Sequence, residues 1–321
     1  MSQLKIRIAS RGSALALWQT NHVKKLLESA HPGITVEITI IKTTGDQILN
    51  SPLSVIGGKG VFTKELEESL LANETDIAVH SLKDLPTTLP DGLQITAILK
   101  RASVEDAFLS NSADMTIESL PHGATVATGS LRRKAQLLAL RPDLNIVDIR
   151  GNVPTRIEKL RNSTWSGMLL ASAGIERLGL SNAINQKIPT TTILPAPGQG
   201  AIAIEARAGD EAISEICSVL HDVQTAYAVT AEREVLRMLG GGCQVPLGTF
   251  ANNNKNGILE LDSCIAMTDG KKMIRASAVA EDSESPLELG ARVASMLIEQ
   301  GGDSIISSLS GDDFASLMGT M

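Results

Sequence analysis

One cysteine of this 321-residue chain stands in a setting that suggests chemistry rather than packing. Cys243 follows three glycines in the segment GGGCQVPLG. Glycines allow positive φ angles and the close approach of a bulky group. Cys217 and Cys264 lie instead in amphipathic helical and strand patterns, where a thiol usually serves as a small core residue. Cys243 is therefore a candidate reactive thiol, with a buried structural cysteine as the alternative.

A second candidate is Asp84, which lies between Lys83 and the Leu85-Pro86 pair, just past the end of a predicted strand. A carboxylate among cations can stabilise a developing positive charge or relay protons. A loop aspartate can equally cap a turn, so both roles stay open. No histidine lies within 20 residues of Cys243. This disfavours a cysteine-nucleophile hydrolase, which needs a base beside the thiol.

The elements that must position these groups alternate between strands and helices. Strands are expected at 4–9, 35–41, 76–80, 124–128, 145–149, 168–172 and 201–207. Helices are expected at 13–30, 62–72, 131–141, 155–161 and 174–178. This order favours parallel strands with helical crossovers, and the strand at 201–207 is expected to return to the first sheet. Two prolines should keep residues 81–90 from being helical.

The pattern changes after about residue 220. A helix is expected at 222–239, followed by strands near 245–251, 258–267 and 273–280 and a final helix at about 287–300. A helix, three strands and a helix form a small α+β domain.

Cations gather at the expected carboxyl ends of the strands, where parallel α/β sheets bind ligands. Lys59 lies in a GGKG loop, and the other cations follow strands: Arg11, Lys83, Arg132, Arg133, Arg150, Arg156 and Arg177. Arginine forks bind carboxylates and phosphates in bidentate fashion, and helix N-termini at the same edge add partial positive charge. The pattern predicts a cationic cleft for a small polyanion, although a single arginine is more often a surface cation.

Composition limits the classes of function. The net charge of −7 disfavours nucleic acid as a partner. Three widely spaced cysteines and five scattered histidines indicate neither a disulfide scaffold nor a bound metal. GGKG matches neither GxxxxGK[ST] nor GxGxxG, so nucleotide binding is not indicated. The N-terminus lacks the apolar core of a signal peptide, and no run of about 18 apolar residues occurs, so we expect a cytoplasmic protein without membrane contact.

Several segments together resemble the porphobilinogen deaminase family of tetrapyrrole biosynthesis. HSLKDLP and GGCQVPLG are the most specific of them. The matching segments span most of the chain in the family order: SRGSALALWQ (10–19), GGKGVFTKELE (57–67), DIAVHSLKDLPT (76–87), TGSLRRKAQL (128–137), IRGNVPTR (149–156), LPAPGQGAIAIE (194–205), TAERE (230–234) and GGCQVPLG (241–248).

The resemblance implies an α/β fold with two doubly wound domains, similar to type-2 periplasmic binding proteins, plus a small α+β C-terminal domain that carries the cysteine. The expected domains are 1–100 with 200–218, then 105–194, and then 222–321. The implied activity is that of a monomeric transferase. It would condense four porphobilinogen molecules head to tail, with loss of ammonia, into the linear tetrapyrrole hydroxymethylbilane.

The resemblance also implies roles for single residues. Cys243 would hold a dipyrromethane cofactor by a thioether bond, and Asp84 would be the catalytic residue that assists loss of ammonia. The cofactor would contact Ser13, Lys83, Asp84, Thr128, Ser130, Arg132, Arg133 and Arg150. The substrate would contact Arg11, Ser13, Arg150, Arg156, Arg177 and Gln199, with Lys59 and Phe62 on a loop over the site. No metal is expected.

Two positions depart from the commonest family pattern. Gly129 replaces a serine before SLRR, and Pro154 follows GNV where glycine or aspartate is usual. One polar contact and the loop shape before Arg156 are therefore open. A binding protein with the same cationic cleft is the main alternative function, and the pairing of Asp84 with Cys243 argues against it.

Overall fold

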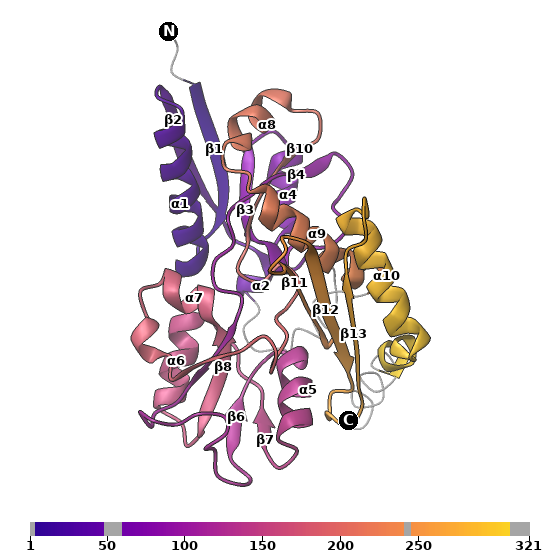
Figure 1. Cartoon of the computed structure of the whole chain (residues 1–321). Coiled ribbons are helices and arrows are strands. Elements are labelled where there is room, and N and C mark those ends of the chain that lie inside the picture. Colours follow the sequence, from indigo (N-terminus) through magenta and orange to yellow (C-terminus); the bar gives the residue numbers. More distant parts are fainter. Residues whose placement is uncertain (1–3, 48–59, 241–244, 309–321) are drawn as a thin grey trace, which may run out of the picture.

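The computed structural model describes residues 4–47, 60–240 and 245–308, which form three sheets and the helices packed on them (Figure 1). The strand orders are β2-β1-β3-β10-β4, β7-β6-β8-β5-β9 and β11-β12-β13. In Figure 1 the first sheet lies above the second, and the third lies beside them. The strands are β1 (Leu4–Arg11), β2 (Ile34–Ile41), β3 (Ile77–Ser81), β4 (Leu93–Ile98), β5 (Asp106–Leu109), β6 (Thr125–Ala127), β7 (Asn145–Val147), β8 (Gly167–Ala171), β9 (Gln186–Ile188), β10 (Ile202–Arg207), β11 (Leu247–Asn253), β12 (Leu259–Ala266) and β13 (Met273–Val279).

The first sheet is mixed rather than wholly parallel. β1 pairs in parallel with β2 and β3, as the alternation of strands and helices predicts. β10 lies between β3 and β4, which confirms the predicted return to this sheet, but it is antiparallel to both neighbours. The expectation of parallel strands is wrong for β10, because the chain enters it beside the carboxyl end of β3, where Ile202 pairs with Ser81.

The second sheet repeats this arrangement. β6 is parallel to β7 and β8, whereas β5 is antiparallel to β8 and β9. The sequence patterns did not predict β4, β5 or β9. β5 and β9 are too short to show a period of two, and β4 alternates poorly because only its ends are buried.

The predicted helices of the first 200 residues are confirmed to within two residues at each end. Ser13, Ser130 and Asn152 cap helices, since each side chain accepts a backbone N–H three residues on. The helices are α1 (Ala14–Ala30), α2 (Thr44–Gln47), α4 (Lys64–Leu71), α5 (Leu131–Leu140), α6 (Val153–Arg161), α7 (Ser172–Arg177), α8 (Glu211–Ser218), α9 (Val223–Met238) and α10 (Pro286–Glu299).

The cores of the sheets are mainly aliphatic, as a chain with 2 % aromatic residues requires. Both Cys217 and Cys264 are fully buried in these cores, which confirms their predicted packing role. Burial raises the pKa of Cys217 to about 12 and also raises the pKa of Cys264. Both thiols are therefore protonated and unreactive near neutral pH.

The third sheet packs with α9 and α10 into the predicted α+β unit. Glu232 on α9 joins this unit to the rest of the chain. Its fully buried carboxylate lies 2.6 Å from Nη1 of Arg101, and it accepts the backbone N–H groups of Gly198 and Ala251 at 2.7 and 2.8 Å. One side chain thus fixes α9 against the segment that follows β4, the segment before β10, and β11.

Two segments, 99–105 and 189–201, cross between the first and second sheets and pair with each other. The backbone N–H groups of Leu99 and Ala102 donate to the carbonyls of Ile202 and Gly200 at 3.0 and 3.1 Å. Gly200 has φ +88°, and a Cβ there would lie only 2.7 and 2.8 Å from the carbonyl oxygens of Ala102 and Ser103. Only glycine fits at this crossing.

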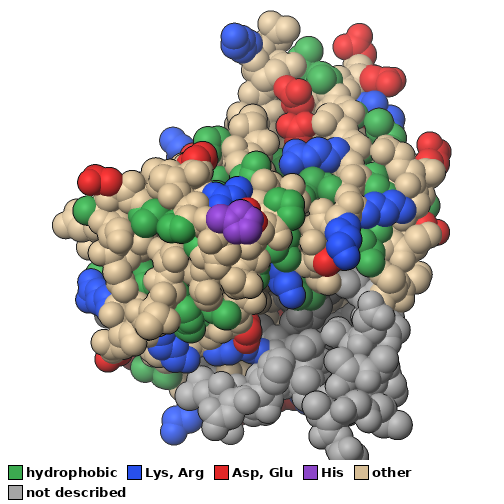
Figure 2. Space-filling view, turned by 90° about the horizontal axis from the view of Figure 1, so that it is seen from below, with side chains coloured by type: hydrophobic (Ala, Val, Ile, Leu, Met, Phe, Trp, Pro, Cys, Tyr) green, Lys and Arg blue, Asp and Glu red, His purple; other side chains and the backbone are tan. Residues whose placement is uncertain are grey.

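No helix in the described ranges is long and apolar enough to cross a membrane. Seen from below, the part of the face that is not grey carries Lys and Arg side chains at separate points, with Asp and Glu side chains between them, rather than one basic patch (Figure 2). The domain boundaries expected at 1–100 with 200–218, 105–194 and 222–321 stay a prediction.

The close approach of the two crossing segments predicts that a change to alanine destabilises the protein more at Gly200 than at Gly257. Gly200→Ala should lower the free energy of unfolding by about 3 kcal/mol, because it adds both backbone strain and a clash. Gly257→Ala should cost only about 1 kcal/mol, since Gly257 has φ +78° but no neighbour within 4 Å of a Cβ. Urea denaturation measures both values. Equal losses would contradict the close approach at the crossing.

Candidate active site

A cavity of about 660 Å³ opens between the first and second sheets. It lies at the carboxyl ends of β1, β3 and β8, which is where the sequence placed the ligand site. The predicted residues that line it are Arg11, Ser13, Phe62, Lys83, Asp84, Arg133, Arg150, Arg156 and Arg177. These residues come from both sheets, so the fold brings together most of the predicted site.

Helix N-termini add to the positive character of the cavity. Ser13, before α1, and Asn152, before α6, both line it, and so does Ala171, before α7. The first backbone N–H groups of a helix lack intrahelical partners and carry partial positive charge, which favours bound anions. α7 has only 6 residues, so we assign the larger contributions to α1 and α6.

Asp84 lies on the cavity wall in a short 3-10 helix (Leu82–Asp84) that directly follows β3. The expectation that residues 81–90 contain no helix is wrong for this single turn, because both prolines come after it. Arg233 on α9 donates to the carbonyls of Leu85 and Pro86 at 2.9 and 2.6 Å. The third unit therefore holds the turn that presents Asp84.

The cations around Asp84 are partly removed from water. Burial in the cavity wall lowers the pKa of Lys83 to about 8, and nearby Arg133 acts in the same direction. Burial also lowers the pKa values of Arg156 and Arg177 to about 10, which leaves both guanidiniums protonated at neutral pH. Desolvated cations gain strongly from an anionic ligand, so the cavity is suited to carboxylates.

Phe62 also lines the cavity and contacts one of the cations. The guanidinium carbon of Arg11 lies 4.2 Å from the centre of the Phe62 ring, a cation–π contact. Arg177 donates from Nη2 to the carbonyl of Gly200 at 2.8 Å and so connects α7 to the crossing segments. Lys59, the other residue expected on the loop before Phe62, lies outside the described residues.

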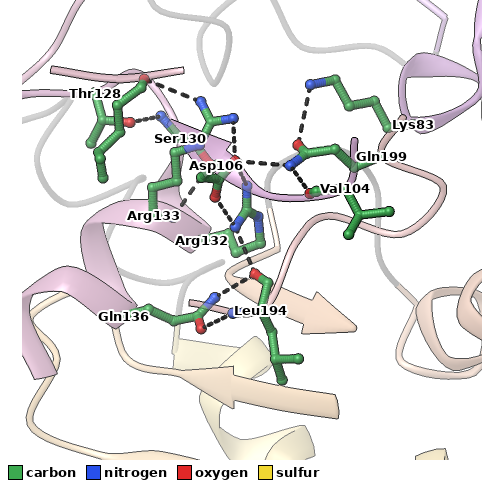
Figure 3. Close-up of polar contacts among 11 residues, drawn as sticks. Lys83, Val104, Asp106, Thr128, Ser130, Arg132, Arg133, Gln136, Leu194 and Gln199 are labelled. Carbon is green, nitrogen blue, oxygen red and sulfur yellow. Dashed lines mark hydrogen bonds and ion pairs between the residues drawn. The ribbon is translucent and has the colours of Figure 1, made fainter. Parts of the chain in front are cut away.

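Four predicted residues do not line the cavity: Thr128, Arg132 and Gln199, which are buried, and Ser130, which is half-buried. Figure 3 shows that Arg132, Arg133 and Gln199 converge on one carboxylate, that of Asp106 at the start of β5. Ser130 caps α5 by accepting the N–H of Arg133, and Thr128 accepts the N–H of Ser130 at 3.3 Å. These two residues hold the N-terminus of the helix that carries both arginines.

Sequence reasoning missed Asp106 and Arg233. Asp106 begins the four-residue strand DAFL, and nothing in that run separates a buried ion-pair partner from a loop aspartate. Arg233 lies in the matched segment TAERE, but it follows no strand end, so its position in the sequence does not indicate a place in the site. Both act on site residues through contacts between distant segments.

The predicted cofactor cysteine belongs to the connection between the C-terminal unit's first helix and first strand. Cys243 lies outside the described residues, between the end of α9 and the start of β11. β11 packs on the second crossing segment, where Thr249 donates its backbone N–H to the carbonyl of Pro195 at 2.9 Å. The position of the thiol itself stays a prediction.

Comparison with solved structures finds several binding proteins. The methionine binding protein MetQ matches at 13 % identity with a TM-score of 0.44, over 69 % of this chain and 92 % of that one. The substrate binding domain of a putative molybdenum ABC transporter from Clostridium difficile matches at 8 % identity with a TM-score of 0.42, over 69 % and 94 %. The fold described above rests on strand order and not on these distant similarities.

Comparison of sequences is far more specific. Residues 6–215 match the family model described as porphobilinogen deaminase, dipyromethane cofactor binding domain, and residues 226–299 match the model of the C-terminal domain of porphobilinogen deaminase. Porphobilinogen deaminase of Syntrophomonas wolfei is 47 % identical over 94 % of this chain and 97 % of its own length. The enzyme of Nitratidesulfovibrio vulgaris is 44 % identical over 96 % and 98 %.

Nearly full-length identity, both family models and a cationic cavity that contains the HSLKDLP aspartate agree with one another. This chain belongs to the porphobilinogen deaminase family.

Proposed function

We propose that this protein condenses four porphobilinogen molecules head to tail into hydroxymethylbilane, with release of one ammonia per condensation. The observation that carries the proposal is the position of Asp84, the one acidic residue among the described lining of the cavity, where the other charged residues are Lys or Arg. Each pyrrole ring of the substrate brings two carboxylates, so a growing chain accumulates negative charge. The cations of both sheets can neutralise that charge while a single carboxylate meets the reacting carbon.

The family's dipyrromethane cofactor fits the residues behind the cavity. The Nε atoms of Arg132 and Arg133 are buried and have no hydrogen-bond partner among the described residues, so two charged donors are available for cofactor carboxylates. Cys243 would hold the cofactor by a thioether bond, with Ser13, Lys83, Thr128, Ser130, Arg132, Arg133 and Arg150 around it. When bound, the cofactor supplies the free pyrrole carbon to which the first substrate is joined.

Asp84 is the proposed catalytic residue. As ammonia leaves the aminomethyl group of porphobilinogen, positive charge develops on the pyrrole that remains, and the carboxylate of Asp84 stabilises it. The same carboxylate can accept hydrogen bonds from pyrrole N–H groups and hold the ring. Arg233 supports this role by fixing the backbone carbonyls that follow Asp84 in the turn.

The substrate carboxylates are assigned to cations of both sheets. Arg11 and Ser13 come from the first sheet, and Arg150, Arg156 and Arg177 come from the second. Lys59 and Phe62 would lie on a loop over the site, where the ring of Phe62 contacts the guanidinium of Arg11. Gln199 contacts the site through Lys83, whose Nζ lies 3.4 Å from its Oε1.

Other properties of the chain stay predictions: a monomer, a cytoplasmic location and no binding of nucleic acid. The comparisons support the substrate and the cofactor at the level of the family.

The cofactor predicts an added mass. Intact-protein mass spectrometry of the active protein should find the sequence mass plus two pyrrole units, because the cofactor is covalently attached. Cys243→Ala should have the unmodified mass and no activity, whereas Cys264→Ala, a change at a buried core thiol, should keep the addition. An unmodified mass for freshly isolated active protein would remove the cofactor from the proposal.

Asp84→Ala should lower kcat for porphobilinogen by about 100-fold or more, since it removes the group that stabilises the developing cation. Circular dichroism and the thermal midpoint should stay close to those of the unchanged protein, because the side chain is exposed to the cavity. Asp91→Ala, at an exposed position on the same connection, is the matched control and should keep full activity. Turnover near normal in Asp84→Ala would exclude a catalytic role.

Lys83 predicts a dependence on pH. In the cavity without cofactor, its lowered pKa of about 8 means that the cation is lost as pH rises through 8, whereas it is present below that value. The rate at which cofactor-free protein acquires two pyrrole units from porphobilinogen, followed by intact mass, should therefore fall above pH 8. In Lys83→Arg the fall should move to higher pH. An identical pH profile for both proteins would show that another group causes it.

A further inference from the structure

We propose that Asp106 is a positioning residue, whose carboxylate holds Arg132, Arg133 and Gln199 in the orientation that the tetrapyrrole-building site requires. The proposal rests on the function proposed above, which assigns those three side chains to cofactor and substrate. Asp106 itself is fully buried and is not among the residues that line the cavity.

The contacts of Asp106 use both of its oxygens (Figure 3). Oδ2 accepts from Nη1 of Arg132 at 2.7 Å. Oδ1 accepts from Nη2 of Arg133 at 2.8 Å, from Nε2 of Gln199 at 2.9 Å and from Nη2 of Arg132 at 3.3 Å. The carboxylate is fully buried, and the two guanidiniums hold the pKa of Asp106 well below its usual range. It is therefore a permanent negative charge at the centre of the group.

The same contacts leave the Nε edge of each guanidinium available for a hydrogen bond to a ligand. Arg132 also donates from Nη1 to the carbonyl of Leu194, and Arg133 donates from Nη1 to that of Leu169. With these Nη groups engaged by Asp106 and the backbone, the Nε atoms are the donors that stay unpartnered among the described residues. Because a guanidinium is planar, fixing its Nη atoms fixes the direction of its Nε–H. Asp106 thus sets where a cofactor carboxylate can bind.

Gln199 extends this control to the other sheet. Its amide donates to Asp106 and, at 2.7 Å, to the carbonyl of Val104, so it joins the two crossing segments. Its oxygen lies 3.4 Å from Nζ of Lys83, the neighbour of Asp84. A change in the position of Asp106 would therefore move Gln199 and, through it, alter the contact with Lys83.

Asp106 could either orient the donors or neutralise their charge, and these two roles predict opposite effects of its loss on the binding of a polycarboxylate. Arg132, Arg133 and Lys83 carry three positive charges near the single negative charge of Asp106. If Asp106 served only to reduce this positive charge, its loss would strengthen binding of a polycarboxylate. If it orients the donors, its loss weakens binding even though the net positive charge increases. A purely structural ion pair would lower thermal stability without changing the kinetics of the folded protein.

The test compares Asp106→Asn and Asp106→Glu with Asp143→Asn. Asp106→Asn removes the charge at constant shape, and Asp106→Glu keeps the charge but moves it by one methylene group. Asp143→Asn is the matched control, because Asp143 also pairs with an arginine, Arg141, but lines no part of the cavity. Each protein is studied as purified, by intact mass for the fraction that carries two pyrrole units and by kcat and KM for porphobilinogen per loaded protein.

We expect kcat/KM per loaded protein to fall by about 10- to 100-fold in both Asp106 variants, mainly through a higher KM, and the loaded fraction to decrease. Asp143→Asn should match the unchanged protein. A lower KM in Asp106→Asn would favour simple neutralisation and overturn the proposal, as would unchanged kinetics together with a lower thermal midpoint. If Asp106→Asn does not fold, Asp106→Glu decides alone, and normal kinetics in that variant would overturn the proposal.

The intact mass of the unchanged protein distinguishes a failure of the positioning role from a failure of the proposed function. If it carries two pyrrole units and Asp106→Asn behaves normally, only the positioning role fails. If the unchanged protein carries no pyrrole units, the proposed function itself fails.

Discussion

Removal of Arg132, Arg133 and Lys83 from water at one point between two sheets is costly unless negative charge lies near them. The protein itself supplies Asp106 as the fully buried partner of both arginines. The lowered pKa of Lys83 and the unpartnered Nε atoms of the arginines show that this compensation is incomplete. A ligand with several carboxylates completes it, so the electrostatics of the fold and the chemistry of the proposed substrate match.

The rest of the structure keeps this charge in place. The two crossing segments meet at Gly200, and Gln199, its neighbour, connects Asp106 to Lys83. The third unit acts on the same region through two adjacent residues of α9. Glu232 binds Arg101 and the N–H of Gly198, while Arg233 holds the turn that carries Asp84. Movement of the third unit relative to the first two would therefore shift the turn that carries Asp84 and the crossing segment next to Gln199.

Strand ends explain why so much of the site could be predicted from the sequence. Arg11 ends β1, and Lys83 and Arg150 follow β3 and β7. The carboxyl ends of parallel strands meet at one edge of a sheet. The same rule could not separate Arg132 from Arg133, because both follow β6 and differ only by the rotation of about 100° per residue in α5. Only Arg133 lines the cavity.

What could not be predicted depends on contacts between distant segments. Asp106 and Gln199 are 93 residues apart, and the antiparallel direction of β10 follows from its entry beside β3 rather than from its own residues. The central claim is that desolvated cations hold a tethered polycarboxylate. A crystal structure of the protein as isolated tests it most directly. Continuous density from Cys243 into the cavity, with carboxylates on the Nε atoms of Arg132 and Arg133, is expected; a free thiol and a solvent-filled cavity would contradict it.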